Sequence, residues 1–130
     1  MPIREREPTL IELLSDLPDN VLGVEAKGEV TGDDYEQVLV PAIEERLARH
    51  DKIRLICVLG GEFDGYSASA MWDDTKVGMR HLFSFERIAL VTDHEMYGRA
   101  VKGFGFLSPA QVRVFGSSEL ADAKAWASEG

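Results

Sequence analysis

The chain has 130 residues and a formal net charge of −9, and 45% of its residues are hydrophobic and 28% charged. This length fits one domain, whose core is large enough to need no disulfide or metal. The negative charge argues against nonspecific binding to nucleic acid, because that requires clustered Lys and Arg. No segment approaches the roughly 20 apolar residues of a membrane span, and the charged start lacks the apolar core of a signal peptide, so the sequence predicts a cytoplasmic protein.

The amino-terminal part predicts a β-hairpin. Residues 1–8 are expected to be a mobile leader, followed by a single domain over residues 9–130. Thr9–Leu14 predicts a first strand and Val21–Lys27 a second. Ser15–Asn20 between them is rich in Pro, Asp and Asn, which favour turns. Two strands joined by so short a turn form an antiparallel hairpin.

A helix is predicted to follow this hairpin. Thr31 can cap its first turn, and apolar residues then recur at helical spacing. Pro41 lies inside this pattern, where it removes a backbone hydrogen bond and clashes with the preceding turn. We therefore expect a helix with a kink near Gln37–Pro41.

The rest of the chain alternates strands and helices. Ile53–Leu59 is almost continuously apolar, as in a central strand covered on both faces, and the thiol of Cys57 is expected to be buried within it. Later strands are predicted at Arg87–Thr92 and Gln111–Phe115, and helices over 66–83, 93–104 and Ser117–Ala127. The predicted order, β-β-α-β-α-β-α-β-α, indicates an α/β domain with a mixed five-stranded sheet and packed helices.

A binding site is expected where the parallel strands end, since ligands of open α/β sheets collect there. Gly60–Gly65 is predicted to be a loop in which glycines let the backbone approach a ligand, and the following helix would present free N–H groups. Asp93–Glu95 and Gly116–Ser118 follow the neighbouring strands. The alternative, a tight turn with Ser67 as a simple N-cap, stays open. The candidate ligand or regulatory residues are Gly60, Gly61, Phe63, Gly65, Tyr66, Ser67, Ser69, Trp72, Asp74 and Asp93.

The acidic pair Asp73 and Asp74 lies early in the predicted second helix. Adjacent residues point about 100° apart on a helix, so they form no catalytic pair by default. Asp74 either orients a ligand at the edge of a pocket or only complements the helix dipole.

No motif indicates catalysis or a cofactor. The chain has neither GxxxxGK[ST] nor a GxGxxG that follows a strand, and its three histidines lack metal-ligand spacing. Gly65–Ser69 departs from the GxSxG hydrolase elbow at its last position. We therefore predict no catalytic residues, no metal and no cofactor, and a protein that is not an enzyme.

The chain contains a set of short motifs spread over about residues 10–127: Leu17–Gly23, Asp34–Tyr35, Val40–Ala42, Gly65–Ala68, Met71–Asp74, Phe85–Ala89, Gly105–Leu107 and Val112–Phe115. Together they resemble the motifs of the bacterial SpoIIAA-like family, small proteins grouped with STAS domains and described as STAS/Sec14-like. The resemblance implies a STAS-like or Sec14-like topology. In anti-sigma-factor antagonists of the STAS type, a phosphorylatable serine begins the helix after the third strand, and Ser67 or Ser69 occupies that region here. The antagonist motif Asp-Ser-[Ser/Thr]-Gly is replaced by Asp64-Gly65-Tyr66-Ser67.

The leading functional hypothesis is a non-enzymatic regulatory or protein-interaction module of STAS type, switched near Ser67. Its expected partner is another protein or a second copy of the chain in a homodimer. The alternative is a small carrier that binds an apolar or amphipathic, lipid-like ligand under the second helix. A third hypothesis, an enzyme with an unrecognised site, would need His94 to face Ser67 or Asp74.

Overall fold

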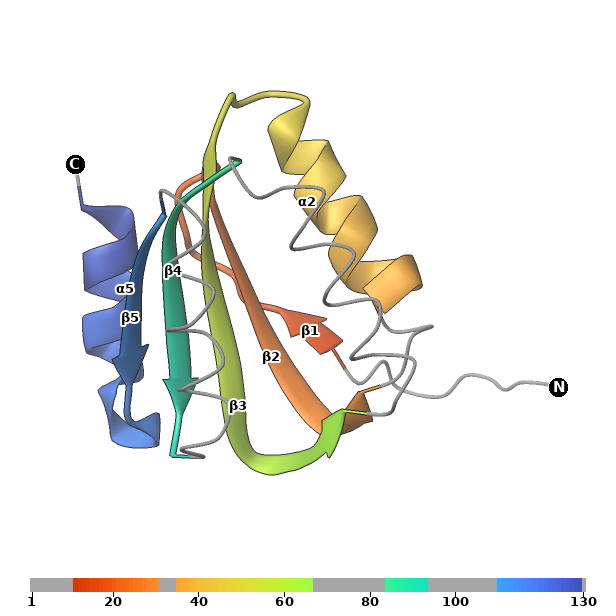
Figure 1. Cartoon of the computed structure of the whole chain (residues 1–130), viewed down its shortest axis with the longest axis vertical. Coiled ribbons are helices and arrows are strands. Elements are labelled where there is room, and N and C mark those ends of the chain that lie inside the picture. Colours follow the sequence, from red (N-terminus) through yellow and green to blue (C-terminus); the bar gives the residue numbers. More distant parts are fainter. Residues whose placement is uncertain (1–10, 31–34, 67–83, 94–109, 130) are drawn as a thin grey trace, which may run out of the picture.

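The structure is a computed structural model that describes residues 11–30, 35–66, 84–93 and 110–129. These residues form a five-stranded sheet in the order β1-β2-β3-β4-β5, with β1 antiparallel to β2 and the other neighbours parallel (Figure 1). The strands are β1 (Ile11–Leu13), β2 (Val21–Val30), β3 (Ile53–Tyr66), β4 (Phe85–Thr92) and β5 (Gln111–Phe115), and the α-helices are α2 (Val40–Leu47) and α5 (Leu120–Ser128). The predicted mixed α/β sheet and its opening hairpin are confirmed.

Apolar side chains cover both faces of the sheet, with α2 on one face and α5 on the other (Figure 1). Because successive side chains of a strand point to opposite faces, β3 supplies both layers. Ile53 and Leu59 pack in the layer that contains α2, whereas Ile56 and Val58 pack in the layer that contains α5. The prediction that β3 is covered on both faces is thus confirmed, but Cys57 is only partly buried in the α2 layer.

Helical winding changes just before Pro41. A π-helical segment, Tyr35–Leu39, precedes α2, and Pro41 lies in the first turn of α2. At that position the missing N–H has no intrahelical partner to lose. The change of winding therefore falls in the range where the sequence predicts a kink, and the predicted cap Thr31 lies outside the described residues.

The prediction of a loop at Gly60–Gly65 is wrong, because β3 continues to Tyr66 beside the end of β2. The pairing is irregular: Ala26 is opposite Leu59, but Gly28 is opposite Phe63, so β3 contains extra residues there. Such bulges bend a strand, and glycine accommodates them. The pairing of β3 with β4 ends at Leu59, and the far end of β3 curves away at the bottom of Figure 1.

The carboxyl-terminal helix begins with a 3-10 turn, Ser117–Glu119, which leads into α5. Ala123 and Ala127 are fully buried, and Leu120 is partly buried. The sequence reasoning missed Trp126, which is buried at the same face and whose ring centroid lies 6.0 Å from that of Phe115. None of the helices in the described ranges is long and apolar enough to cross a membrane.

Candidate functional site

The carboxyl ends of β4 and β5 are joined by one carboxylate. Asp93 follows β4, and Ser117 lies two residues after the end of β5. The Ser117 backbone N–H donates to Asp93 Oδ1 at 3.0 Å, and the Ser117 hydroxyl donates to Asp93 Oδ2 at 2.5 Å. Hydroxyl bonds to a carboxylate are short and strong because the acceptor is charged. We call this pair the Asp93–Ser117 clasp.

A second carboxylate closes the turn between β5 and α5. The Gly116 N–H donates to Glu119 Oε1 at 2.7 Å, and the Glu119 N–H donates to the Gly116 carbonyl at 2.9 Å. Acidic groups suit the start of a helix, where backbone N–H groups are free and the dipole is positive. By residue type, Ser117 or Ser118 is the expected cap of this helix. That expectation is wrong, because the Ser117 hydroxyl bonds to Asp93 and neither cap of this segment uses a serine hydroxyl.

Hydrogen bonds to carboxylates fix the geometry of this edge. The Ser117 hydroxyl donates to a carboxylate, which does not remove its proton in the way that a neighbouring histidine base does. Within the described part of the chain, no three His, Cys, Asp or Glu residues are placed to hold a metal ion. The clasp thus orients two strand ends and the first turn of a helix.

The predicted site residues divide into three groups. Asp93 is described with its side chain and lies at the clasp. Five residues lie in β3, where the backbone is described but not the side chains: Gly60, Gly61, Phe63, Gly65 and Tyr66. The remaining four, Ser67, Ser69, Trp72 and Asp74, lie outside the described residues. The structure therefore brings Asp93 together with Ser117 from the predicted Gly116–Ser118 loop.

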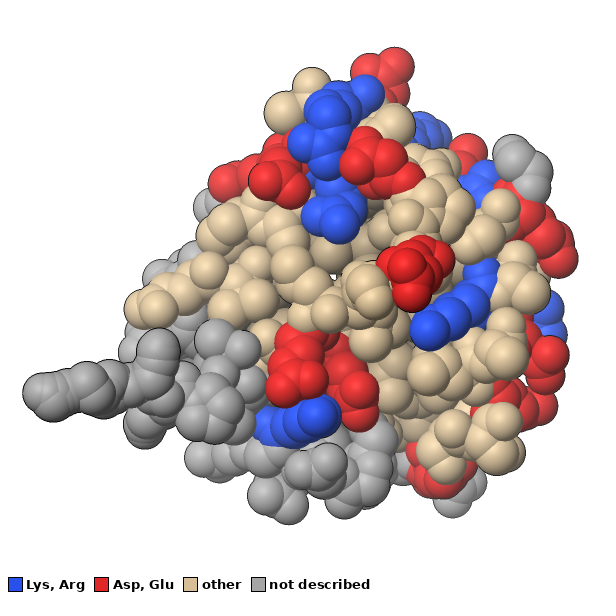
Figure 2. Space-filling view, turned by 180° about the vertical axis from the view of Figure 1, so that it is seen from behind, with Lys and Arg blue, Asp and Glu red and all other residues tan. Residues whose placement is uncertain are grey.

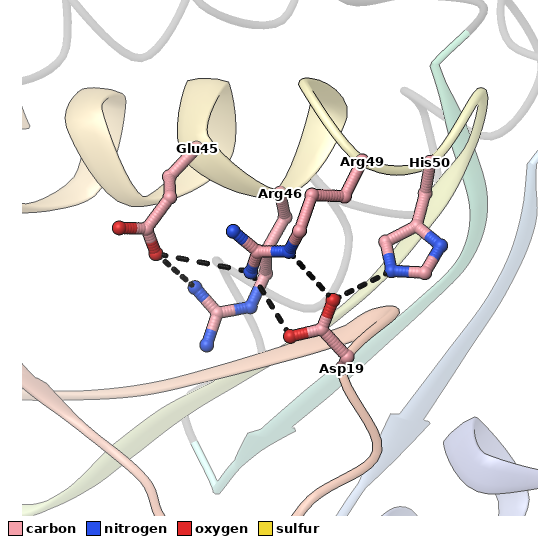
Figure 3. A network of polar contacts seen from close by, with 5 residues as sticks. All are labelled: Asp19, Glu45, Arg46, Arg49 and His50. Atoms are coloured by element: carbon pink, nitrogen blue, oxygen red, sulfur yellow. Dashed lines mark hydrogen bonds and ion pairs between the residues drawn. The ribbon is translucent and has the colours of Figure 1, made fainter.

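Sequence reasoning missed a polar cluster at the opposite end of the sheet (Figure 3). Asp19, in the turn between β1 and β2, accepts two hydrogen bonds from Arg49, each 2.9 Å, and lies 2.7 Å from His50 Nε2. Glu45 lies within ion-pair distance of Arg46 and Arg49. We call these five residues the Asp19 network. It ties the turn to the end of α2.

The charged form of Asp19 is strongly favoured in this network. Hydrogen bonds from Arg49 and then His50 hold the pKa of the Asp19 carboxyl well below its usual range, and the bond to Asp19 raises the pKa of Arg49. Both side chains are largely exposed, so water screens the pair and limits its contribution to stability. Asp19 and Arg49 are 30 residues apart, and no sequence signal pairs them.

Two arginines hold the carboxyl-terminal end of α5. Arg54, only 6% exposed, donates from Nη1 to the carbonyls of Ala127 (2.9 Å) and Glu129, and from Nε to Glu86 Oε1 at 2.8 Å. Arg87 Nη1 donates to the Trp126 carbonyl at 2.6 Å. These bonds satisfy carbonyls that a helix end leaves without intrahelical partners. We call Arg54 and Arg87 the arginine clamp. An arginine inside an apolar strand was the available signal, since buried charges are paired.

Comparisons with known proteins place the chain. A model of the SpoIIAA-like family matches residues 21–128. Among solved structures, the chain is similar to an uncharacterized protein of the DUF3478 family with a SpoIIAA-like fold from Shewanella loihica PV-4, with 28% sequence identity and a TM-score of 0.75 over 95% of this chain and 98% of that one. No curated protein matches. The resemblance identified from the sequence motifs is confirmed, and the chain belongs to the SpoIIAA-like family.

Proposed function

We propose that the protein is a non-enzymatic regulatory or protein-interaction module whose partner binds at the carboxyl ends of β3, β4 and β5. The observation that carries this proposal is the Asp93–Ser117 clasp, which fixes two neighbouring strand ends at the edge where ligands of α/β sheets bind. Asp93 is exposed, so a partner can reach it. A fixed surface also loses less conformational entropy when it binds.

Charge favours a protein partner with basic side chains at its contact surface. The chain carries a net charge of −9, and Asp93 and Glu119 lie at the proposed edge. On the face of the molecule in Figure 2, the described Lys and Arg side chains lie next to Asp and Glu rather than in a separate basic area. Complementary charge increases the rate and specificity of association. A second copy of the chain remains a candidate partner, as a homodimer.

Site-specific photo-crosslinking in the native host tests the location of this surface. A photo-reactive amino acid replaces Ser118, an exposed residue beside the clasp, and in a matched control it replaces Lys52, an exposed residue at the opposite end of the sheet. We expect crosslinks to one defined protein, or to a second copy, from position 118 and none to it from position 52. Equal crosslinking from both positions, or none from position 118, would rule out the proposed edge.

Phosphorylation at Ser67 is the proposed switch. A phosphate adds about −1.5 to −2 charges at neutral pH, which would change any contact with a basic partner. Intact-mass measurement of protein from its native host under several stresses should reveal a phosphate that is lost in Ser67→Ala and kept in Ser69→Ala. If no growth condition gives a phosphorylated mass, the module has no such switch.

A carrier of an apolar or amphipathic ligand is the second candidate function. It is favoured by apolar side chains that stay only partly buried on the α2 face, among them Leu55, Val112 and Val114. A carrier should retain its ligand during purification, so native mass spectrometry should detect an added mass that disappears on denaturation. A mass equal to that of the chain alone removes this alternative.

A further inference from the structure

Polar contacts fasten α5 to the sheet at both of its ends. At its beginning, Ser117 is bound by Asp93 from the carboxyl end of β4. At its end, two arginines near the starts of β3 and β4 donate to backbone carbonyls. Arg54 binds the carbonyls of Ala127 and Glu129, and Arg87 binds that of Trp126. The segment 117–128 therefore connects the carboxyl edge of the sheet with the amino edge.

Docking on the sheet is a condition for α5 to be helical at all. An isolated helix shorter than about 12 residues is marginal in water, and α5 has nine residues. Two of its three buried residues, Ala123 and Ala127, have small side chains that bury little apolar area. The third is Trp126, and the guanidinium groups of Arg87 and Arg113 lie over its ring, 5.3 and 5.5 Å from the ring centroid. The polar contacts at the two ends therefore add to the apolar burial of Trp126 in docking the helix.

We propose that α5 docks and undocks as one unit, and that Asp93 couples its docking to binding at the proposed partner edge. A basic side chain of a partner that takes the carboxylate of Asp93 competes with the two donors of Ser117. The start of α5 then loses its attachment, and the whole helix undocks more often, including its far end at the arginine clamp. This coupling rests on the proposed function, because it assigns Asp93 to the partner surface.

Coupling of this kind is reciprocal. If binding at Asp93 weakens the docking of α5, then a substitution that weakens the arginine clamp must also make Asp93 more available and tighten partner binding. A substitution of Arg87 would thus change the affinity of the partner, although Arg87 lies at the opposite end of the helix from the proposed contact surface.

Hydrogen exchange of the free protein, followed by mass spectrometry, tests the single-unit docking. Asp93→Ala removes the clasp, Arg87→Met removes one side of the clamp, and Asp19→Asn is a control in the remote Asp19 network. We expect Asp93→Ala to raise exchange about tenfold through the last turn of α5, and Arg87→Met to do the same in its first turn. The control should leave exchange in α5 unchanged while β3 and β4 stay protected in all three variants.

Two results would overturn the inference. If each substitution raises exchange only in the turn beside it, the ends fray independently and nothing links the two edges. If α5 exchanges at the same rate as β3 and β4 in every variant, it opens only when the whole domain unfolds. Should Asp93→Ala fail to fold, Ser117→Ala removes only the hydroxyl donor and gives the same comparison. No partner is present in this experiment, so its failure is distinct from a failure of the crosslinking at position 118.

Discussion

The Asp19 network and the arginine clamp use the same chemistry, guanidinium bound to oxygen, in different surroundings. The side chains of Arg49 and Asp19 are 47% and 56% exposed, whereas that of Arg54 is 8% exposed. Water competes for the exposed pair, so its short bonds shift pKa values without adding much stability. The oxygens bound by Arg54 include the carbonyl of Ala127 at a buried position, and leaving that carbonyl without a donor has a full desolvation cost.

Bond geometry alone does not rank these two clusters by their contribution to stability. The network holds the pKa of Asp19 well below its usual range, and Asp19 has the bidentate geometry of a strong pair. The features that mark the importance of Arg54 are its burial and its bonds to backbone carbonyls. We therefore expect the order of effects on stability to follow burial.

Removing Arg54 should have the largest effect. Arg54→Met keeps an unbranched side chain but leaves the carbonyls of Ala127 and Glu129 without their donors. We expect the free energy of unfolding to fall by about 3 kcal/mol, measured by urea denaturation. Arg54→Lys, which keeps the charge without the planar fork, should lie between wild type and Met. A loss below about 1 kcal/mol for Arg54→Met would mean that burial does not separate the two clusters.

Packing, rather than the ion pair, should hold the turn that carries Asp19. A Cβ at position 23 would lie 2.6 Å from Leu17 Cδ1 and 2.9 Å from Leu14 Cδ1, closer than real contacts allow. Gly23→Ala should therefore lower the free energy of unfolding by about 2 kcal/mol through overpacking.

A double variant separates packing from backbone effects at position 23. Adding Leu17→Ala to Gly23→Ala should cost less than the sum of the two single substitutions, because the smaller side chain makes room for the new Cβ. If the two losses in free energy of unfolding are additive, the glycine is needed for a reason other than contact with Leu17. Packing around position 23 would then not explain how the turn is held.

The sheet was predictable because apolar patterning fixes which segments become strands and which faces they cover. Ile53–Leu59 and Gln111–Phe115 are strands as predicted. The continuation of β3 to Tyr66 was not predictable, because Gly60–Gly65 has the composition of a turn. Its partner, the end of β2 at Gly28–Val30, lies far away in the sequence and provides the pairing.

The candidate site was predictable as a place but not as a set of bonds. The rule that parallel strands end at one edge brought Asp93 and the Gly116–Ser118 loop together from the sequence. Whether Ser117 would cap its helix or bond to Asp93 depends on side-chain geometry, which no local pattern contains. Trp126 and Arg54 were missed for a related reason, since their partners come from strands and helices distant in the chain.

The smallest effect on stability at neutral pH is expected for Asp19→Asn, which removes the charge but keeps the shape. The folded state lowers the pKa of Asp19, so the stability that its charged form contributes is fully present above the ordinary value of 3.8 and is lost as pH falls through the lowered value. The wild type and the variant should therefore differ by a small amount at pH values above the ordinary value, and the difference should disappear in strong acid. Urea denaturation across this range measures it, with Asp51→Asn, at an exposed residue beside the network, as the control. If Asp19→Asn costs as much as Arg54→Met at pH 7, exposure does not limit the Asp19 network, and ranking the two clusters by burial is wrong.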